Sequence, residues 1–152
     1  MTPVMASLPF AARKTESLIE PADIASKTIL VVDDNAANAE LVSAILEMNG
    51  FHVRATDNAE TAIIMTRLML PALVLMDINL PGMNGIAATK ILKNDPATHH
   101  VIVIGLTGEI QSQPSADFDG YVTKPFQIEA LVGTIKSFLS RSEENFGARC
   151  RL

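Results

Sequence analysis

Five short apolar runs, separated by segments with helical periodicity, constrain the fold more than any other feature of the chain. The runs are TILVV (28–32), FHVRAT (51–56), ALVLM (72–76), VIVIGL (101–106) and GYVT (120–123). Four of them have apolar stretches bounded by turn or polar residues, which is typical of strands covered on both faces of a parallel sheet. In FHVRAT apolar and polar residues alternate, so one face meets water and we expect this strand at an edge of the sheet.

The segments between these runs predict helices. Leu41, Ala44, Ile45 and Met48 share one face of the first, and Gly50 stands where that helix would end. The apolar positions of the other three are Ala59, Ala62 and Ile63, then Ile86 and Ile91 before the closing Pro96, then Ile128, Leu131, Val132, Ile135, Phe138 and Leu139. Alternating strands and helices predict a doubly wound α/β fold with a parallel sheet and right-handed crossovers.

The 152 residues suit one domain with a substantial core, and 48% hydrophobic with 19% charged residues is a globular composition. Residues 1–26 mix Pro, Ser, Ala and charged residues without sustained periodicity, so we expect a flexible N-terminal extension. The domain then spans 27–140, and 141–152 form a C-terminal tail. The start at Met1 favours a free-standing protein.

Charge and cysteine content exclude several classes of function. A net charge of −5 without a Lys/Arg cluster argues against a nucleic-acid partner. No apolar run approaches the length of about 18 residues that a membrane span needs. The single cysteine, Cys150, cannot form an internal disulfide, which fits the reducing cytoplasm. We expect the three histidines, His52, His99 and His100, on the surface or in loops.

Acidic residues follow two of the predicted buried strands. Asp33 and Asp34 come after the first run, and Asp77 comes after the third. Sites in doubly wound sheets form at the carboxyl ends of strands, so we expect these carboxylates at one place. Clustered carboxylates repel one another, and Mg²⁺ resolves this because it prefers hard oxygen ligands. Thr107 and Lys124, after the fourth and fifth runs, would equip the site to hold a phosphoryl group.

Four motifs make the match specific. VVDDN, LMDINLPGMNG, LTG and YVTKPF, in this order, resemble the receiver domain of bacterial two-component response regulators over roughly residues 27–140. The resemblance implies a flavodoxin-like fold whose five strands have the order 2-1-3-4-5. It also implies a signalling protein that catalyses only its own phosphorylation and dephosphorylation.

The resemblance assigns a role to each residue at the predicted site. Asp77 is the expected phosphoacceptor, which takes a phosphoryl group from a histidine kinase or a histidine phosphotransfer protein. The implied Mg²⁺ ligands are Asp33, Asp34, Asp77 and the backbone carbonyl of Asn79. Lys124 is expected to contact the phosphoryl group, and Thr107 and Tyr121 to respond to it together before a downstream protein target is bound. The peptide between Lys124 and Pro125 is expected to be cis.

One interval departs from the family. Residues 108–119 are several residues shorter than the interval that carries the family's fourth helix, and they include Pro114. We therefore predict a shortened or missing fourth helix. The family's usual dimerisation face would change with it, so we expect a monomer.

Other interpretations remain open at this stage. The Asp33–Asp34 pair could serve only as a helix N-cap. The chain could be a degenerate receiver that binds partners without phosphorylation, or the receiver of a hybrid kinase. An aspartyl-phosphate phosphatase is a further alternative, but such enzymes generally carry a second acid two residues after the nucleophile, where this chain has Asn79.

Overall fold

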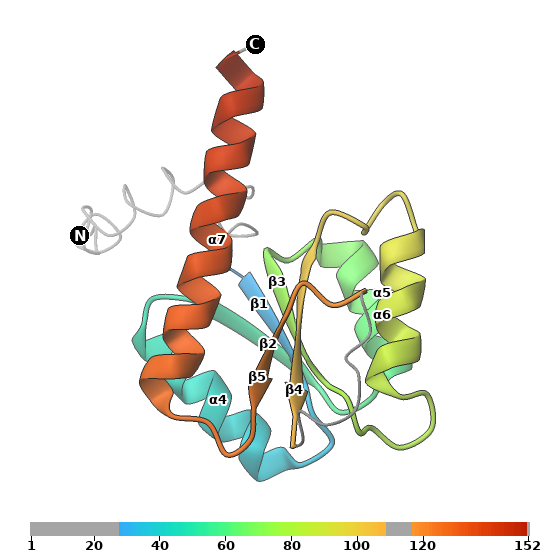
Figure 1. Cartoon of the computed structure of the whole chain (residues 1–152). Helices are drawn as coiled ribbons and strands as arrows, with labels where there is room; N and C mark the ends of the chain where they lie inside the picture. The colour runs from blue at the N-terminus through green and yellow to red at the C-terminus, as the bar shows by residue number, and fades with distance from the viewer. Residues whose placement is uncertain (1–27, 109–116, 152) are drawn as a thin grey trace, which may run out of the picture.

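The computed structural model describes residues 28–108 and 117–151, which form a five-stranded parallel sheet with helices on both faces (Figure 1). The strands are β1 (Thr28–Val32), β2 (His52–Thr56), β3 (Leu73–Asp77), β4 (Ile102–Thr107) and β5 (Gly120–Thr123). Their order is β2-β1-β3-β4-β5, and every neighbouring pair is parallel. The predicted flavodoxin-like fold and strand order are confirmed.

Four helices cover the sheet within the described residues: α4 (Ala36–Met48), α5 (Ala59–Met69), α6 (Gly85–Asn94) and α7 (Ile128–Arg151). Residues of α4 and α7 pack in one apolar cluster on one face, and residues of α5 and α6 pack in another on the opposite face. Figure 1 shows α7 continuing as one helix beyond the sheet, across residue 140 where we expected the domain to end.

The central strands carry the core. All five residues of β1 and all five of β3 are buried, as their apolar runs predict. On β2, by contrast, His52, Arg54 and Ala55 are exposed. The predicted position of this strand at the edge of the sheet is confirmed, although Ala55 is exposed where the alternating pattern predicts the covered face.

Asparagine begins three of the helices. The side chains of Asn35, Asn58 and Asn84 accept hydrogen bonds from the third backbone N–H of α4, α5 and α6, at 2.8–3.0 Å. Because Asn35 caps α4, the preceding aspartates are not needed for that purpose. The interpretation of Asp33 and Asp34 as no more than a helix cap is therefore wrong.

The face of the first helix was predicted incorrectly. Ile45 is buried as expected, but Leu41 is 56% exposed and Met48 is 85% exposed. The buried positions of α4 are instead Ala39, Val42, Ile45 and Leu46. Apolar residues occur around most of this helix, so periodicity alone could not choose the face that meets the sheet.

Two local features end helices where the sequence predicts. Gly50 adopts a φ of +91° just after α4, a conformation that glycine adopts without strain. α6 ends at Asn94, before Pro96. The prediction of a shortened or missing fourth helix concerns residues 108–119, of which 109–116 lie outside the described residues.

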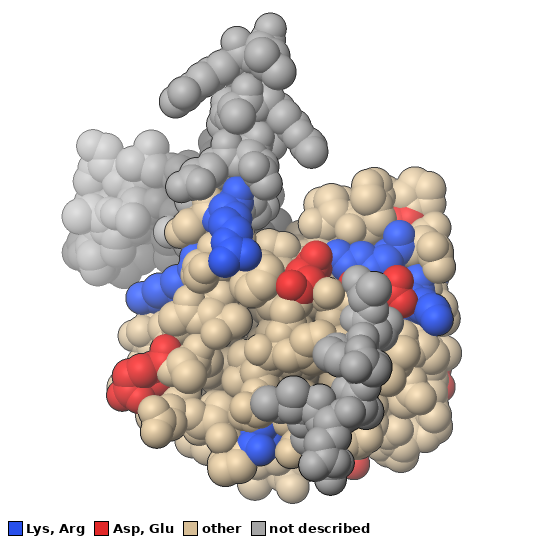
Figure 2. All heavy atoms as spheres, in the orientation of Figure 1, with Lys and Arg blue, Asp and Glu red and all other residues tan. Residues whose placement is uncertain are grey.

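Surface charge is mixed on the face that Figure 2 shows. Lys and Arg groups lie beside Asp and Glu groups and do not merge into a single basic surface there. Within the described residues, no helix is both long and apolar enough to cross a membrane.

Candidate functional site

Three carboxylates meet at the carboxyl edge of the sheet, at the ends of two adjacent strands. Val32 of β1 pairs with Met76 of β3, so the residues that follow them, Asp33 and Asp77, lie side by side. Asp34 joins them, and one carboxylate oxygen from each of the three residues lies within 4.8 Å of the others. Asp33 and Asp77 are buried, with 2% and 5% of their surface exposed, whereas Asp34 is exposed.

Lys124, in the loop after β5, brings a positive charge to this cluster. Its Nζ lies 3.2 Å from Asp77 Oδ2 and 3.8 Å from Asp33 Oδ2. The register of β4 with β5 pairs Thr107 with Thr123, so Lys124 begins the loop after β5 at the same edge. The peptide from Lys124 to Pro125 is cis, as the resemblance implied.

Backbone N–H groups hold the two buried carboxylates in place. Asn35 N donates to Asp33 Oδ1 at 2.9 Å, and Asn79 N donates to Asp77 Oδ1 at 3.0 Å. Burial nevertheless raises the pKa of the Asp33 carboxyl, since its desolvation outweighs the hydrogen bond from Asn35 and the attraction of Lys124. The pocket thus brings three carboxylates together beside one lysine.

The three carboxylates fit a hard divalent cation. Carboxylate oxygens, two of them buried, are ligands that Mg²⁺ prefers, and Mg²⁺ commonly uses one or two carboxylates together with phosphate oxygens and waters.

The two predicted switch residues lie on the strands beside the site. Thr107 ends β4, is half-buried, and accepts a hydrogen bond at its carbonyl from Lys124 N at 2.7 Å. Tyr121 is half-buried on β5 and packs against the apolar cluster beneath α5 and α6. The ring of Phe118 lies against it, 5.1 Å away between centroids.

Sequence reasoning missed two residues that shape the site. The side chain of Asn35 caps α4, and its backbone N–H donates to Asp33. An asparagine directly before a helical segment is a usual signal of an N-cap. Gly85 lets α6 approach β3, because a Cβ there would lie 2.3 Å from the Asp77 carbonyl oxygen. In the sequence, only the presence of glycine at position 85, the last residue of PGMNG, indicated this close approach.

The histidines lie elsewhere. His52, His99 and His100 are exposed and come before or at the start of β2 and β4, at the sheet edge opposite the carboxylates. His99 Nδ1 lies 3.0 Å from the carbonyl oxygen of Pro96. This agrees with the expected surface or loop positions.

Comparison with known proteins agrees with the geometry of the site. The family described as the response regulator receiver domain matches residues 29–136. A curated relative, the polar-differentiation response regulator DivK of Brucella anthropi, is 33% identical over 118 residues, which are 74% of this chain and 96% of DivK.

Solved structures share the same fold. One is a putative response regulator from Chloroflexus aurantiacus, with a TM-score of 0.71 and 28% identity over 75% of this chain and 98% of that one. Another is the signal receiver domain of a histidine kinase from Syntrophus aciditrophicus, with a TM-score of 0.68 and 32% identity over 75% of this chain and 90% of that one. The chain therefore belongs to the response regulator receiver domain family.

Proposed function

We propose that this receiver accepts a phosphoryl group on Asp77 and signals through contacts with other proteins. The observation that carries the proposal is a buried Asp77 carboxylate with Lys124 Nζ at 3.2 Å and two further carboxylates in the same cluster. This combination supplies a nucleophile, a fixed positive charge and a cation site at one point.

The proposed reaction forms a bond between an Asp77 carboxylate oxygen and the phosphorus atom of the donor. With a phosphohistidine donor, the phosphorus–nitrogen bond breaks and the released imidazole takes up a proton. Lys124 stabilises negative charge on the phosphoryl oxygens. Thr107 donates a hydrogen bond to the product, and Tyr121 changes position with it.

Mg²⁺ is the proposed cofactor, held by Asp33, Asp34, Asp77 and the backbone carbonyl of Asn79. When bound, it neutralises charge on the carboxylates and on the transferring phosphoryl group. The N–H of Asn79 already bonds to Asp77 Oδ1, which keeps this part of the loop beside the cluster.

Two alternatives fit less well. Receiver domains are generally signalling modules rather than enzymes, and Asn79 stands where an aspartyl-phosphate phosphatase would need its second acid. A degenerate receiver would have no need for buried carboxylates beside a lysine, because unused buried charge destabilises a fold. A cytoplasmic, monomeric protein without a nucleic-acid partner remains part of the proposal.

The phosphodonor is proposed to be a histidine kinase or a histidine phosphotransfer protein that docks over α4. This helix begins next to the carboxylates, and it exposes Ala37, Leu41, Ala44 and Met48 at intervals of four, three and four residues. Such spacing forms one apolar stripe on the helix, which suits packing against another helix. A docked donor would then lie beside Asp77.

Intact-mass measurement after incubation with acetyl phosphate tests the proposal. With Mg²⁺, the wild type should gain the mass of one phosphoryl group, and it should gain none after chelation. Asp77→Asn should abolish the gain. The matched control is Asp57→Asn, because Asp57 is an exposed aspartate that follows β2 at the same sheet edge but lies outside the three-carboxylate cluster. Full labelling of Asp77→Asn would refute the assignment.

A further inference from the structure

The outward side of α4 carries acidic residues beside its apolar stripe. The stripe consists of Ala37, Leu41, Ala44 and Met48, all of them exposed. Glu40 and Glu47 are exposed as well, and each directly precedes a large residue of the stripe. Because seven residues make about two helical turns, the two carboxylates lie one above the other along the same side of the stripe.

No other residue of α4 compensates these two charges. The helix contains no Lys, Arg or His. Within the part of the chain that the structure describes, neither Glu40 nor Glu47 forms an ion pair. The apolar residues beside them also face solvent, with Leu41 56% and Met48 85% exposed. This side of α4 therefore offers a partner both apolar surface to bury and negative charge to pair with.

This charge decides between the partners that an apolar helix face can accept. A second copy of this chain, with its α4 packed against the first, would bring glutamates to a helix without any basic residue, and like charges across an interface cost free energy. A helix with an apolar seam flanked by Lys or Arg would bury the same stripe and pair with both carboxylates. In helix–helix packing, the charged residues beside the apolar seam set the choice of partner.

We infer that α4 selects a phosphodonor whose docking helix carries Lys or Arg beside its apolar seam, and that Glu40 and Glu47 recognise this positive charge. The inference rests on the proposed function, in which the donor packs on α4 beside Asp77, and it adds the chemistry by which the donor is recognised. Exposed charges at an interface act mainly on the rate of association, and salt screens them. Phosphoryl transfer from the donor should therefore slow as the ionic strength rises.

Phosphoryl transfer in vitro, measured with the whole chain and Mg²⁺, tests this inference. The probes are the histidine kinases and histidine phosphotransfer proteins of the source organism, each purified in its phosphorylated form. The donor that labels the wild type fastest is then used with the variants, over a range of salt concentrations. Acetyl phosphate serves as the reference donor, because it is too small to need a docking helix.

Three variants make the test specific. Glu40→Lys and Glu47→Lys each reverse one charge beside the stripe. The matched control is Glu60→Lys, which changes the net charge by the same amount at an exposed position of α5, on the opposite face of the sheet. Denaturant unfolding of each variant establishes that it is folded at the temperature of the transfer measurement.

We expect Glu40→Lys and Glu47→Lys to accept the phosphoryl group from the protein donor roughly three- to tenfold more slowly than the wild type at low salt. The difference should shrink at high salt. Glu60→Lys should match the wild type, and acetyl phosphate should label all four proteins alike. Replacing the facing Lys or Arg of the donor by Glu should restore transfer to the variant that it opposes.

Unchanged or faster transfer to either α4 variant, or equal slowing of Glu60→Lys, would overturn this inference alone, because labelling by acetyl phosphate would still support the proposed function. A wild-type dimer that Met48→Glu abolishes would assign α4 to a second copy and would also overturn it. Labelling by acetyl phosphate but by none of the purified protein donors would do the same. No labelling of the wild type by any donor would overturn the proposed function together with this inference.

Discussion

Asp33 is a buried carboxylate beside two others, and its pKa is raised. Burial raises that pKa above the ordinary value of 3.8, despite a hydrogen bond from Asn35 N and the nearby Lys124. The folded protein consequently holds this proton more tightly than the unfolded chain does. Stability therefore falls as the pH rises through the ordinary value and then through the raised one.

Asp33→Asn should therefore increase the free energy of unfolding at neutral pH when Mg²⁺ is absent. Denaturant unfolding in a chelator measures this, with Asp34→Asn as the control, because Asp34 is exposed and should give a smaller gain. Excess Mg²⁺ should narrow the difference in unfolding free energy between Asp33→Asn and the wild type, since only the wild type retains all the carboxylates proposed to bind the ion. A less stable Asp33→Asn protein in chelator would contradict this account.

The acids and the lysine were predictable at the residue scale because they are unusual at the ends of apolar strands. Asp33, Asp77 and Lys124 all lie where the sequence places them. Asn35 and Gly85 were not predicted as part of the site, since their contributions are a backbone N–H and a missing Cβ. Such contributions become visible only when the loop after each strand is seen in three dimensions.

At the scale of elements, the contact between α6 and β3 fixes the loop that follows Asp77. Gly85 N donates to the carbonyl of Ile78 at 3.1 Å, and a Cβ on Gly85 would lie 2.3 Å from the Asp77 carbonyl oxygen. Helix and strand cannot keep this approach if residue 85 carries a side chain.

Gly85→Ala should lower the free energy of unfolding by about 1–3 kcal/mol, as overpacking of a core does, and slow labelling by acetyl phosphate. The matched control is Gly133→Ala, because Gly133 lies in α7 and a methyl group added there would meet nothing within 4 Å among the described residues beyond its own helix backbone. That substitution should add about 0.5–1 kcal/mol of stability through helix propensity. Equal effects of the two changes on unfolding would contradict the role of Gly85.

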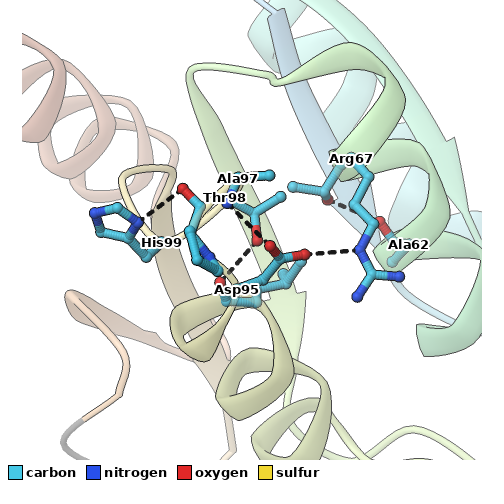
Figure 3. A network of polar contacts seen from close by, with 9 residues as sticks. Ala62, Arg67, Asp95, Ala97, Thr98 and His99 are labelled. Atoms are coloured by element: carbon cyan, nitrogen blue, oxygen red, sulfur yellow. Dashed lines mark hydrogen bonds and ion pairs between the residues drawn. The ribbon is translucent and has the colours of Figure 1, made fainter.

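A second element contact links α5 to the turn after α6 (Figure 3). Asp95 accepts a hydrogen bond from Ala97 N at 2.9 Å, and its other oxygen lies 2.9 Å from Arg67 Nε. The hydrogen bond from Ala97 first, and Arg67 second, lower the pKa of Asp95 below its ordinary value of 3.8. This contact therefore stabilises the fold above that value, and the stabilisation is lost as the pH falls through the lowered pKa.

Asp95→Asn should accordingly lose less stability than the wild type between neutral pH and pH values below 3.8. Thermal unfolding across this range measures the difference. The loss of stability of Arg67→Gln on acidification should lie between those of the wild type and Asp95→Asn. This substitution leaves the larger contribution to the pKa shift, the hydrogen bond from Ala97, in place. Parallel pH profiles for the wild type and Asp95→Asn would exclude this role for Asp95.

Element type and order were predictable from the sequence, but the orientation of α4 was not. Apolar runs, together with glycine and proline at the ends of helical segments, predicted the alternation of strands and helices. On α4, Val42 and Leu46 face the sheet while Leu41 and Met48 face outward. A helix that is apolar on more than one side gives no periodicity signal strong enough to identify its buried face.

At the scale of the whole molecule, this outward stripe lies on one face of the sheet and α5 lies on the other. Met48→Glu should slow phosphorylation roughly fivefold or more, as the loss of an apolar interface contact does. The phosphodonor in this experiment is a histidine kinase or phosphotransfer protein that labels the wild type. Labelling by acetyl phosphate should not change, because this small donor needs no docking surface.

Leu68→Glu is the control for that prediction, since Leu68 is 80% exposed on α5 and should not meet the donor. Its labelling rate with the protein donor should equal that of the wild type. Equal slowing by both substitutions would exclude α4 as the docking helix.

The central claim is that Asp77 becomes phosphorylated, and chemical location of the product tests it most directly without any substitution. Borohydride reduces an acyl phosphate to an alcohol, so phosphorylated aspartate becomes homoserine. Wild-type protein treated with acetyl phosphate and Mg²⁺, then reduced and digested, should show this change at residue 77 alone, and none when a chelator replaces Mg²⁺. Reduction at Asp33 or Asp34 instead of Asp77, or no reduced residue in protein that carries the added mass, would contradict the account.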